Sequence, residues 1–132
     1  MINVYSKSDS KLGRLLSNFA HTPFVGGGRT FASVEAWWYW YTTGKKHGEL
    51  CGLYGFAAKA AGRKYTQVAA VTPAVLKQVY LLKLAAHPDI REMLLASGDE
   101  PFDHFYVYDG VKVPATRWLW TAKLWAEVRA EL

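Results

Sequence analysis

The segment Ser33-Val34-Glu35-Ala36-Trp37-Trp38-Tyr39-Trp40-Tyr41-Thr42 (residues 33–42) decides the fold, because it predicts a helix that other elements must enclose. Ser33 is a good helix N-cap, and Glu35 falls in the first turn, where a carboxylate suits the helix dipole. We expect this helix to continue to about Gly44. Aromatic residues cover most of its surface, and a helix that is apolar nearly all round is buried.

Glu35 shares one face of this helix with Trp38, Tyr39 and Thr42, because residues three, four and seven apart are neighbours on a helix. A carboxylate in the first turn of a buried helix is paired, caps the helix or lines a cavity. Two interpretations stay open: Glu35 completes a cap at the surface edge, or it is a general acid or base whose pKa is raised by aromatic walls. In the second case the rings offer stacking surfaces for a base or a sugar.

Short strands are predicted before this helix. Residues 2–5 alternate apolar and polar side chains, and a polar loop follows over residues 6–11. A second extended region is expected over residues 15–25. The three glycines at 26–28 predict a turn, from which residues 29–31 return as a third strand. The opening quarter of the chain is therefore expected to form a small sheet.

Helices are predicted after this point, each with a start or stop signal such as proline or glycine. The expected elements are helices from Gly48 or Glu49 to Gly62, from Pro73 to Ala86, from Pro88 to Gly98 and from Thr116 to Glu131, with a strand from His104 to Tyr108 and a turn at Asp109-Gly110. The predicted class is α+β: one helix-dominated domain over residues 1–132 with a small antiparallel sheet.

Composition narrows the classes of function. The chain has 132 residues, 51% of them hydrophobic, which suits one core and one domain. Its single cysteine, Cys51, excludes an intramolecular disulfide, and no cysteine or histidine has metal-ligand spacing nearby, so we expect no metal. No apolar run reaches the ~20 residues of a membrane span, which predicts a cytoplasmic protein without membrane contact. A net charge of +5 favours an anionic partner, either phosphates or nucleic acid.

Several short motifs occur in one order along residues 13–99. Each alone is weak, but their order and spacing are hard to obtain by chance. They are Leu16-Ser17-Asn18-Phe19, the stretch Phe31-Ala32-Ser33-Val34-Glu35 with its aromatic continuation, Ala58-Lys59-Ala60-Ala61-Gly62-Arg63, Lys83, and the stretch from His87 to Gly98 that ends in Leu94-Leu95-Ala96-Ser97-Gly98. In these motifs the chain resembles the NADAR family, also called YbiA-like.

The resemblance implies an N-glycosidase without cofactor that splits the bond between ribose and a nitrogen. The family's substrates are ADP-ribose-related: riboflavin-pathway intermediates, or guanine bases carrying ADP-ribose, whose removal reverses a modification of nucleic acid. Stand-alone members occur in bacterial and viral genomes. Glu35 takes the place of the catalytic glutamate. The residues expected near the substrate are Ser17, Asn18, Phe19, Lys59, Gly62 and Arg63, with Trp38 added from the aromatic helix face.

The chain departs from the family pattern at Thr42. The family usually has a lysine there, and such an amine can form a Schiff base with opened ribose. Lys45, Lys46 and Lys83 are candidate replacement amines, although long stems such as that of Lys83 more often reach water. Three alternatives follow: a relocated amine, a purely acid-base mechanism, or a binder of ADP-ribose-type nucleotides without turnover. A basic nucleic-acid-binding module that uses exposed aromatic residues is a further alternative.

The C-terminal part has fewer signals. His104 stands where the family prefers an acid and is the histidine to test, whereas His21, His47 and His87 are expected to be structural or at the surface. The stripe of Trp118, Ala122 and Trp125 at helical spacing predicts core packing rather than a site, and Trp120 is expected at its boundary.

Overall fold

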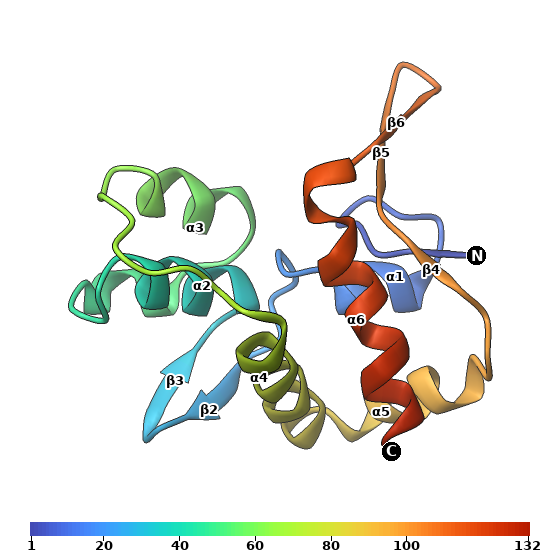
Figure 1. Ribbon diagram of the computed structural model, residues 1–132, viewed down its shortest axis with the longest axis horizontal. Coiled ribbons are helices and arrows are strands. Elements are labelled where there is room, and N and C mark those ends of the chain that lie inside the picture. Colours follow the sequence, from blue (N-terminus) through green and yellow to red (C-terminus); the bar gives the residue numbers. More distant parts are fainter.

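The helix expected over residues 33–42 is present as α2 (Val34–Thr42) in the computed structural model, which describes residues 1–132 (Figure 1). Its N-cap is Ser33, whose hydroxyl accepts the Ala36 N–H at 3.0 Å. The other helical elements are α1 (Lys11–Leu16), the 3-10 turn η1 (Gly48–Gly52), α3 (Gly55–Gly62), α4 (Pro73–Ala86), α5 (Pro88–Ala96), the 3-10 turn η2 (Thr116–Trp118) and α6 (Leu119–Ala130). Helices dominate, which confirms the α+β class.

The strands form three separate pairs rather than one sheet. They are β1 (Ile2–Asn3), β2 (Phe24–Gly26), β3 (Arg29–Phe31), β4 (Phe102–Asp103), β5 (Phe105–Tyr108) and β6 (Val111–Pro114). The pairs β2–β3 and β5–β6 are antiparallel hairpins, whereas β1 pairs in parallel with β4. The expected sheet in the opening quarter is confirmed for the hairpin of β2 and β3, but it is wrong for β1, which finds its partner near the other end of the chain.

The prediction of an extended region over residues 15–25 is also wrong at its start, where α1 ends at Leu16. Ser10 caps this helix by accepting the Gly13 N–H at 3.1 Å. Gly13 allows the close approach to β1, since a Cβ there would lie 2.0 Å from the Asn3 carbonyl oxygen. The cap lies inside the polar loop predicted over residues 6–11, so the end of that loop is the start of a helix.

The predicted helix from Gly48 to Gly62 is broken into η1 and α3. Leu53 between them has extended backbone, and its carbonyl accepts the Ser33 hydroxyl at 2.9 Å. This tertiary hydrogen bond replaces a helical one and ties the break to the start of α2. The predicted last helix likewise begins as the separate turn η2 before α6.

Helices α4 and α6 pack together at the centre of the core. Tyr80 and Trp125 stack there with ring centroids 3.9 Å apart, and both are buried. Trp125 and Ala122 lie in the core as predicted. No helix combines the length and the apolar character needed to cross a lipid bilayer.

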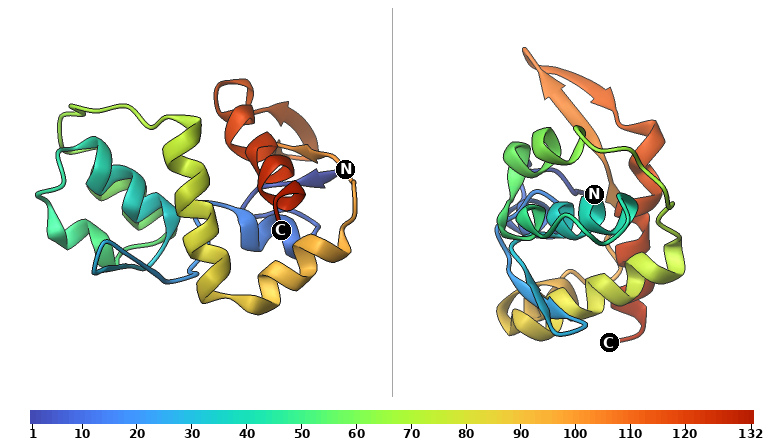
Figure 2. Two further views of the ribbon diagram at one scale, coloured as in Figure 1. Left: turned by 60° about the horizontal axis from the view of Figure 1, so that its bottom comes forward. Right: turned by 90° about the vertical axis from the view of Figure 1, so that its left-hand side faces the viewer.

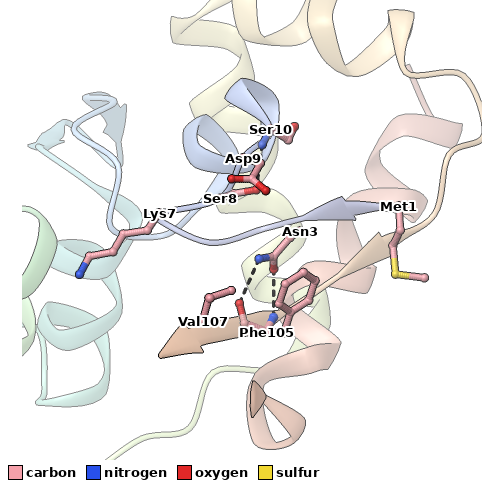
Figure 3. Close-up of a pocket in the computed structure, with 8 residues that line it drawn as sticks. All are labelled: Met1, Asn3, Lys7, Ser8, Asp9, Ser10, Phe105 and Val107. Atoms are coloured by element: carbon pink, nitrogen blue, oxygen red, sulfur yellow. Dashed lines mark hydrogen bonds between the residues drawn. The ribbon is translucent and has the colours of Figure 1, made fainter. Parts of the chain in front are cut away.

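The β5–β6 hairpin projects from this core (Figures 1 and 2). Asn3 holds its base: the side-chain amide donates to the Phe105 carbonyl at 3.0 Å, and the side-chain oxygen accepts the Phe105 N–H at 2.9 Å (Figure 3). The residues around these bonds line a small pocket of about 340 Å³. The hairpin is thus fixed along β5 and free at its tip.

Candidate active site

The loop at Ser17-Asn18-Phe19 is held by three helices. Its successive backbone carbonyls accept hydrogen bonds from the Lys83 ammonium of α4 at 3.3 Å, from the Glu35 N–H of α2 at 2.9 Å and from the Gly55 N–H of α3 at 3.0 Å. The N-terminal ends of α2 and α3 therefore meet at one loop.

A large cavity of about 1220 Å³ opens beside this loop. In Figure 1, α3 lies on one side and the β5–β6 hairpin with η2 on the other, and side chains of both line the cavity together with those of α2. Its wall contains four basic side chains and a single carboxylate, and many of its other residues are aromatic. The charged residues are Lys7, Lys59, Arg63, Arg117 and Glu35.

The carboxylate of Glu35 is set up for proton transfer near neutral pH. Burial raises its pKa from 4.5 to about 7, and the positive charges of Lys59 and Arg63 act against this rise. Loss of water around the carboxylate thus outweighs the attraction of two cations. At pH 7 a substantial fraction of Glu35 is protonated and able to donate a proton.

Helix α3 packs on α2 at a glycine. A Cβ on Gly62 would lie 2.1 Å from Cγ of Tyr39, so no other residue fits without displacing the ring. The close approach brings Lys59 and Arg63 along the same wall as Glu35 and Tyr39. Burial raises the pKa of Tyr39, and the charge of the exposed Arg63 acts against this rise. Gly62 therefore acts by letting the two helices meet.

All the residues that the sequence placed at a substrate site line this one cavity. They are Ser17, Asn18, Phe19, Glu35, Trp38, Lys59, Gly62 and Arg63. Thr42 lines it too; it is 3% exposed, and its hydroxyl has no hydrogen-bond partner. Residues from three separate motifs are thus brought together.

None of the three candidate replacement amines lines the cavity. Lys45 lies over the Tyr41 ring at 5.1 Å, and Lys46 is exposed beyond the end of α2. The long stem of Lys83 predicts that its ammonium reaches water, but this prediction is wrong, because Lys83 is 0% exposed. Burial lowers its pKa to about 7. The amines that do line the cavity belong to Lys7 and Lys59.

Sequence reasoning missed the wall formed by the C-terminal part of the chain. Trp118, expected in the core, lines the cavity and packs edge-on against Trp38 with centroids 5.4 Å apart. Trp120 lies 6.2 Å from the same ring, and Arg117 stacks over Trp118. The short turn η2 carries no sequence signal, so nothing indicated that it would face the site.

The histidines divide as expected. His104 lines the cavity, its Nδ1 has no partner, and burial lowers its pKa. His21 and His47 stack on Tyr54 and Tyr65, and His87 bonds the Pro23 carbonyl at 2.8 Å. No group of three His, Cys, Asp or Glu side chains is arranged to hold a metal ion.

No protein-family model and no curated protein matches the chain. One solved structure, the NMR structure of the E. coli protein YbiA, matches with a TM-score of 0.74 over 98% of this chain and 83% of YbiA. Sequence identity is 23%, so the likeness concerns the fold. The chain has the fold of YbiA, which confirms at the level of the fold the YbiA-like resemblance of its motifs.

Proposed function

We propose that the chain is an N-glycosidase that hydrolyses the bond between ribose and nitrogen in an ADP-ribosyl or ribosyl-phosphate N-glycoside. The observation that carries this proposal is Glu35, a carboxylate with a pKa of about 7 in a cavity otherwise lined by basic and aromatic side chains. The motif resemblance to the NADAR family and the YbiA fold support the same substrate class.

Protonated Glu35 donates its proton to the leaving nitrogen, and the C1–N bond breaks with its electron pair going to that nitrogen. Positive charge develops on ribose C1, and the carboxylate that remains stabilises it. Water then attacks C1 and returns a proton to Glu35, which restores the enzyme. Because the proton must be present at the start, the rate falls as pH rises through about 7.

The basic side chains hold the phosphates. Arg63 has the planar group that binds phosphate oxygens in a bidentate way, and Lys59 adds a point charge close to Glu35. Arg117 adds positive charge to the part of the wall that η2 forms. Asn18, whose side-chain oxygen accepts the Tyr80 hydroxyl at 3.3 Å, keeps its amide nitrogen for the substrate.

A second candidate is a binder of ADP-ribose-type nucleotides without turnover. It is favoured by Thr42, which stands where the family usually has a lysine, and by the positions of Lys45, Lys46 and Lys83 away from the cavity. This candidate predicts retained affinity for ADP-ribose and no product at any pH. Activity that appears on Thr42→Lys substitution supports it.

Turnover is tested by incubating the protein with ADP-ribosylated guanine nucleic acid, NAD and a phosphoribosyl-amine, and by measuring released base or amine. We expect release from at least one substrate and a loss of about 100- to 10,000-fold in Glu35→Gln. Glu92→Gln is the matched control, since Glu92 is an exposed carboxylate on α5. ADP-ribose binding without release from any substrate contradicts the enzyme and leaves the binder.

A further inference from the structure

The β5–β6 hairpin has two unlike faces. Cross-strand partners share a face, so Tyr106 and Tyr108 lie on the same side as Val113 and Val111. The other face carries Phe105, Val107, Lys112 and Pro114. We call the first the tyrosine face and the second the anchored face.

The anchored face has protein partners. The Lys112 ammonium lies 3.6 Å from the Asp103 carboxylate and 4.3 Å from the centroid of the Phe105 ring. Phe105 is also the residue whose backbone exchanges two hydrogen bonds with Asn3. These contacts hold the hairpin in one orientation relative to the cavity.

The tyrosine face looks into the cavity, which both Tyr106 and Tyr108 line. Tyr5 packs edge-on against Tyr106 with centroids 5.4 Å apart, and the Tyr106 and Tyr108 rings are 6.0 Å apart. Toward the tip the face has little cover, since Tyr108 is 59% and Val111 is 62% exposed. A contiguous apolar surface at a cavity mouth is typical of a surface that a ligand covers.

A second aromatic group, Trp38, Trp118 and Trp120, lies elsewhere on the cavity wall. It adjoins Glu35, because Trp38 is one turn along the same helix face. In the proposed reaction, the bond whose nitrogen Glu35 protonates therefore lies beside the tryptophans. The tyrosine face belongs to β5 and β6, whereas Glu35 and Trp38 belong to α2, so the two aromatic groups stand on different elements of the cavity wall.

The cavity is larger than one ring and one phosphate need. Its volume of about 1220 Å³ exceeds the roughly 300–1,000 Å³ usual for small-molecule sites. One ribosyl phosphate bound beside Glu35 and the tryptophans leaves the tyrosine face bare. Basic side chains outnumber carboxylates in the wall, so the wall favours an anionic group between the two aromatic regions.

We propose that the tyrosine face is a second ring-binding subsite, at which Tyr106 and Tyr108 stack a flat heteroaromatic ring at the end of the ligand remote from the cleaved bond. The ligand then has a nucleobase joined through phosphates to the ribose at Glu35. This inference rests on the proposed function for the position of the cleaved bond, but stacking on the tyrosine face requires no turnover.

Binding of ribose 5-phosphate, AMP and ADP-ribose is measured by calorimetry on the wild type, Tyr106→Ala and Tyr108→Ala. Val107→Ala is the matched control, because Val107 is comparably exposed at 47% on the anchored face of the same strand. We expect Tyr108→Ala to weaken AMP and ADP-ribose about tenfold and ribose 5-phosphate less than about twofold. Tyr108→Trp restores the affinity, since any flat ring can stack.

Three outcomes overturn the subsite: unchanged ADP-ribose affinity in both tyrosine variants, an equal loss for ribose 5-phosphate, or no binding of AMP and ADP-ribose by the wild type. Tyr108→Ala keeps the test valid if Tyr106→Ala unfolds, because the Tyr108 side chain is mostly exposed. Turnover is judged separately: a wild type that binds ADP-ribose through Tyr108 but releases no base or amine from ADP-ribosylated guanine nucleic acid, NAD or a phosphoribosyl-amine contradicts the enzyme and supports the subsite.

Discussion

Glu35 at the cavity wall and Lys83 inside the core both have pKa values of about 7, but their surroundings differ. Burial moves both values. Glu35 faces the charges of Lys59 and Arg63 and lines a cavity that a ligand can enter. Lys83 is 0% exposed, and its ammonium donates to the Ser17 carbonyl under the Trp125 ring.

The difference separates a group that a ligand can reach from one that it cannot. A strongly shifted pKa marks a candidate for function, but structural groups are shifted too. Access decides between them, because a proton donor must touch its substrate. Lys83 instead positions the Ser17 loop against which α2 begins, and this explains why a lysine lies in the core without a carboxylate.

The largest expected effect concerns Glu35. Its pKa is about 7 in the folded protein and 4.5 in the unfolded chain. As pH rises, the unfolded chain releases the proton first, so the wild type loses stability as pH rises from 4.5 to 7. Glu35→Gln removes this loss. We expect the variant to gain about 3 kcal/mol in unfolding free energy at pH 8 and little at pH 4, by urea denaturation. An equal change at both pH values contradicts the raised pKa.

Lys83 is expected to show the opposite slope. Its pKa falls from 10.5 to about 7 on folding, so the unfolded state binds more protons above pH 7 and stability rises with pH. Between pH 7 and 9 the contribution is about 2–3 kcal/mol, and it disappears in Lys83→Met. Lys123→Met is the control, because Lys123 is exposed on α6. A slope retained in Lys83→Met means that another group causes it.

Tyr80 connects the two regions. Its hydroxyl lies 3.0 Å from the Thr121 carbonyl and 3.3 Å from the Asn18 side chain. Tyr80→Phe keeps the stacking on Trp125 and removes the hydroxyl hydrogen bonds to the Thr121 carbonyl and to the Asn18 side chain. We expect a loss of about 1 kcal/mol in stability and a smaller loss of ADP-ribose affinity. An affinity loss that exceeds the stability loss would show that Tyr80 acts chiefly on the site.

The smallest effects are expected at Lys45 and Lys46. Both are exposed and outside the cavity, and Lys45 contributes only a surface contact with the Tyr41 ring. Each alanine variant should keep base release within about twofold and lose less than about 1 kcal/mol of stability. Abolished release in either variant would identify the relocated amine and refute the acid-base mechanism.

Local signals in the sequence determined much of the fold. Ser33 starts α2, Pro73 and Pro88 start α4 and α5, and the glycine turn joins β2 to β3, because each depends on neighbours within a few residues. The sequence also determined the set of candidate site residues, because they belong to short motifs that can be recognised by their order even though they are far apart along the chain.

Only the tertiary structure decided which surfaces meet. The pairing of β1 with β4, the break at Leu53 and the place of Trp118 on the cavity wall all depend on contacts distant in sequence. The contrast between Glu35 and Lys83 also depends on the tertiary structure. Both residues lie on ordinary helices, α2 and α4, and helical spacing alone does not show which side chain is enclosed in the core. Burial is a property of the packed chain, so only packing places Glu35 on the wall of a cavity and Lys83 inside the core against the Ser17 carbonyl.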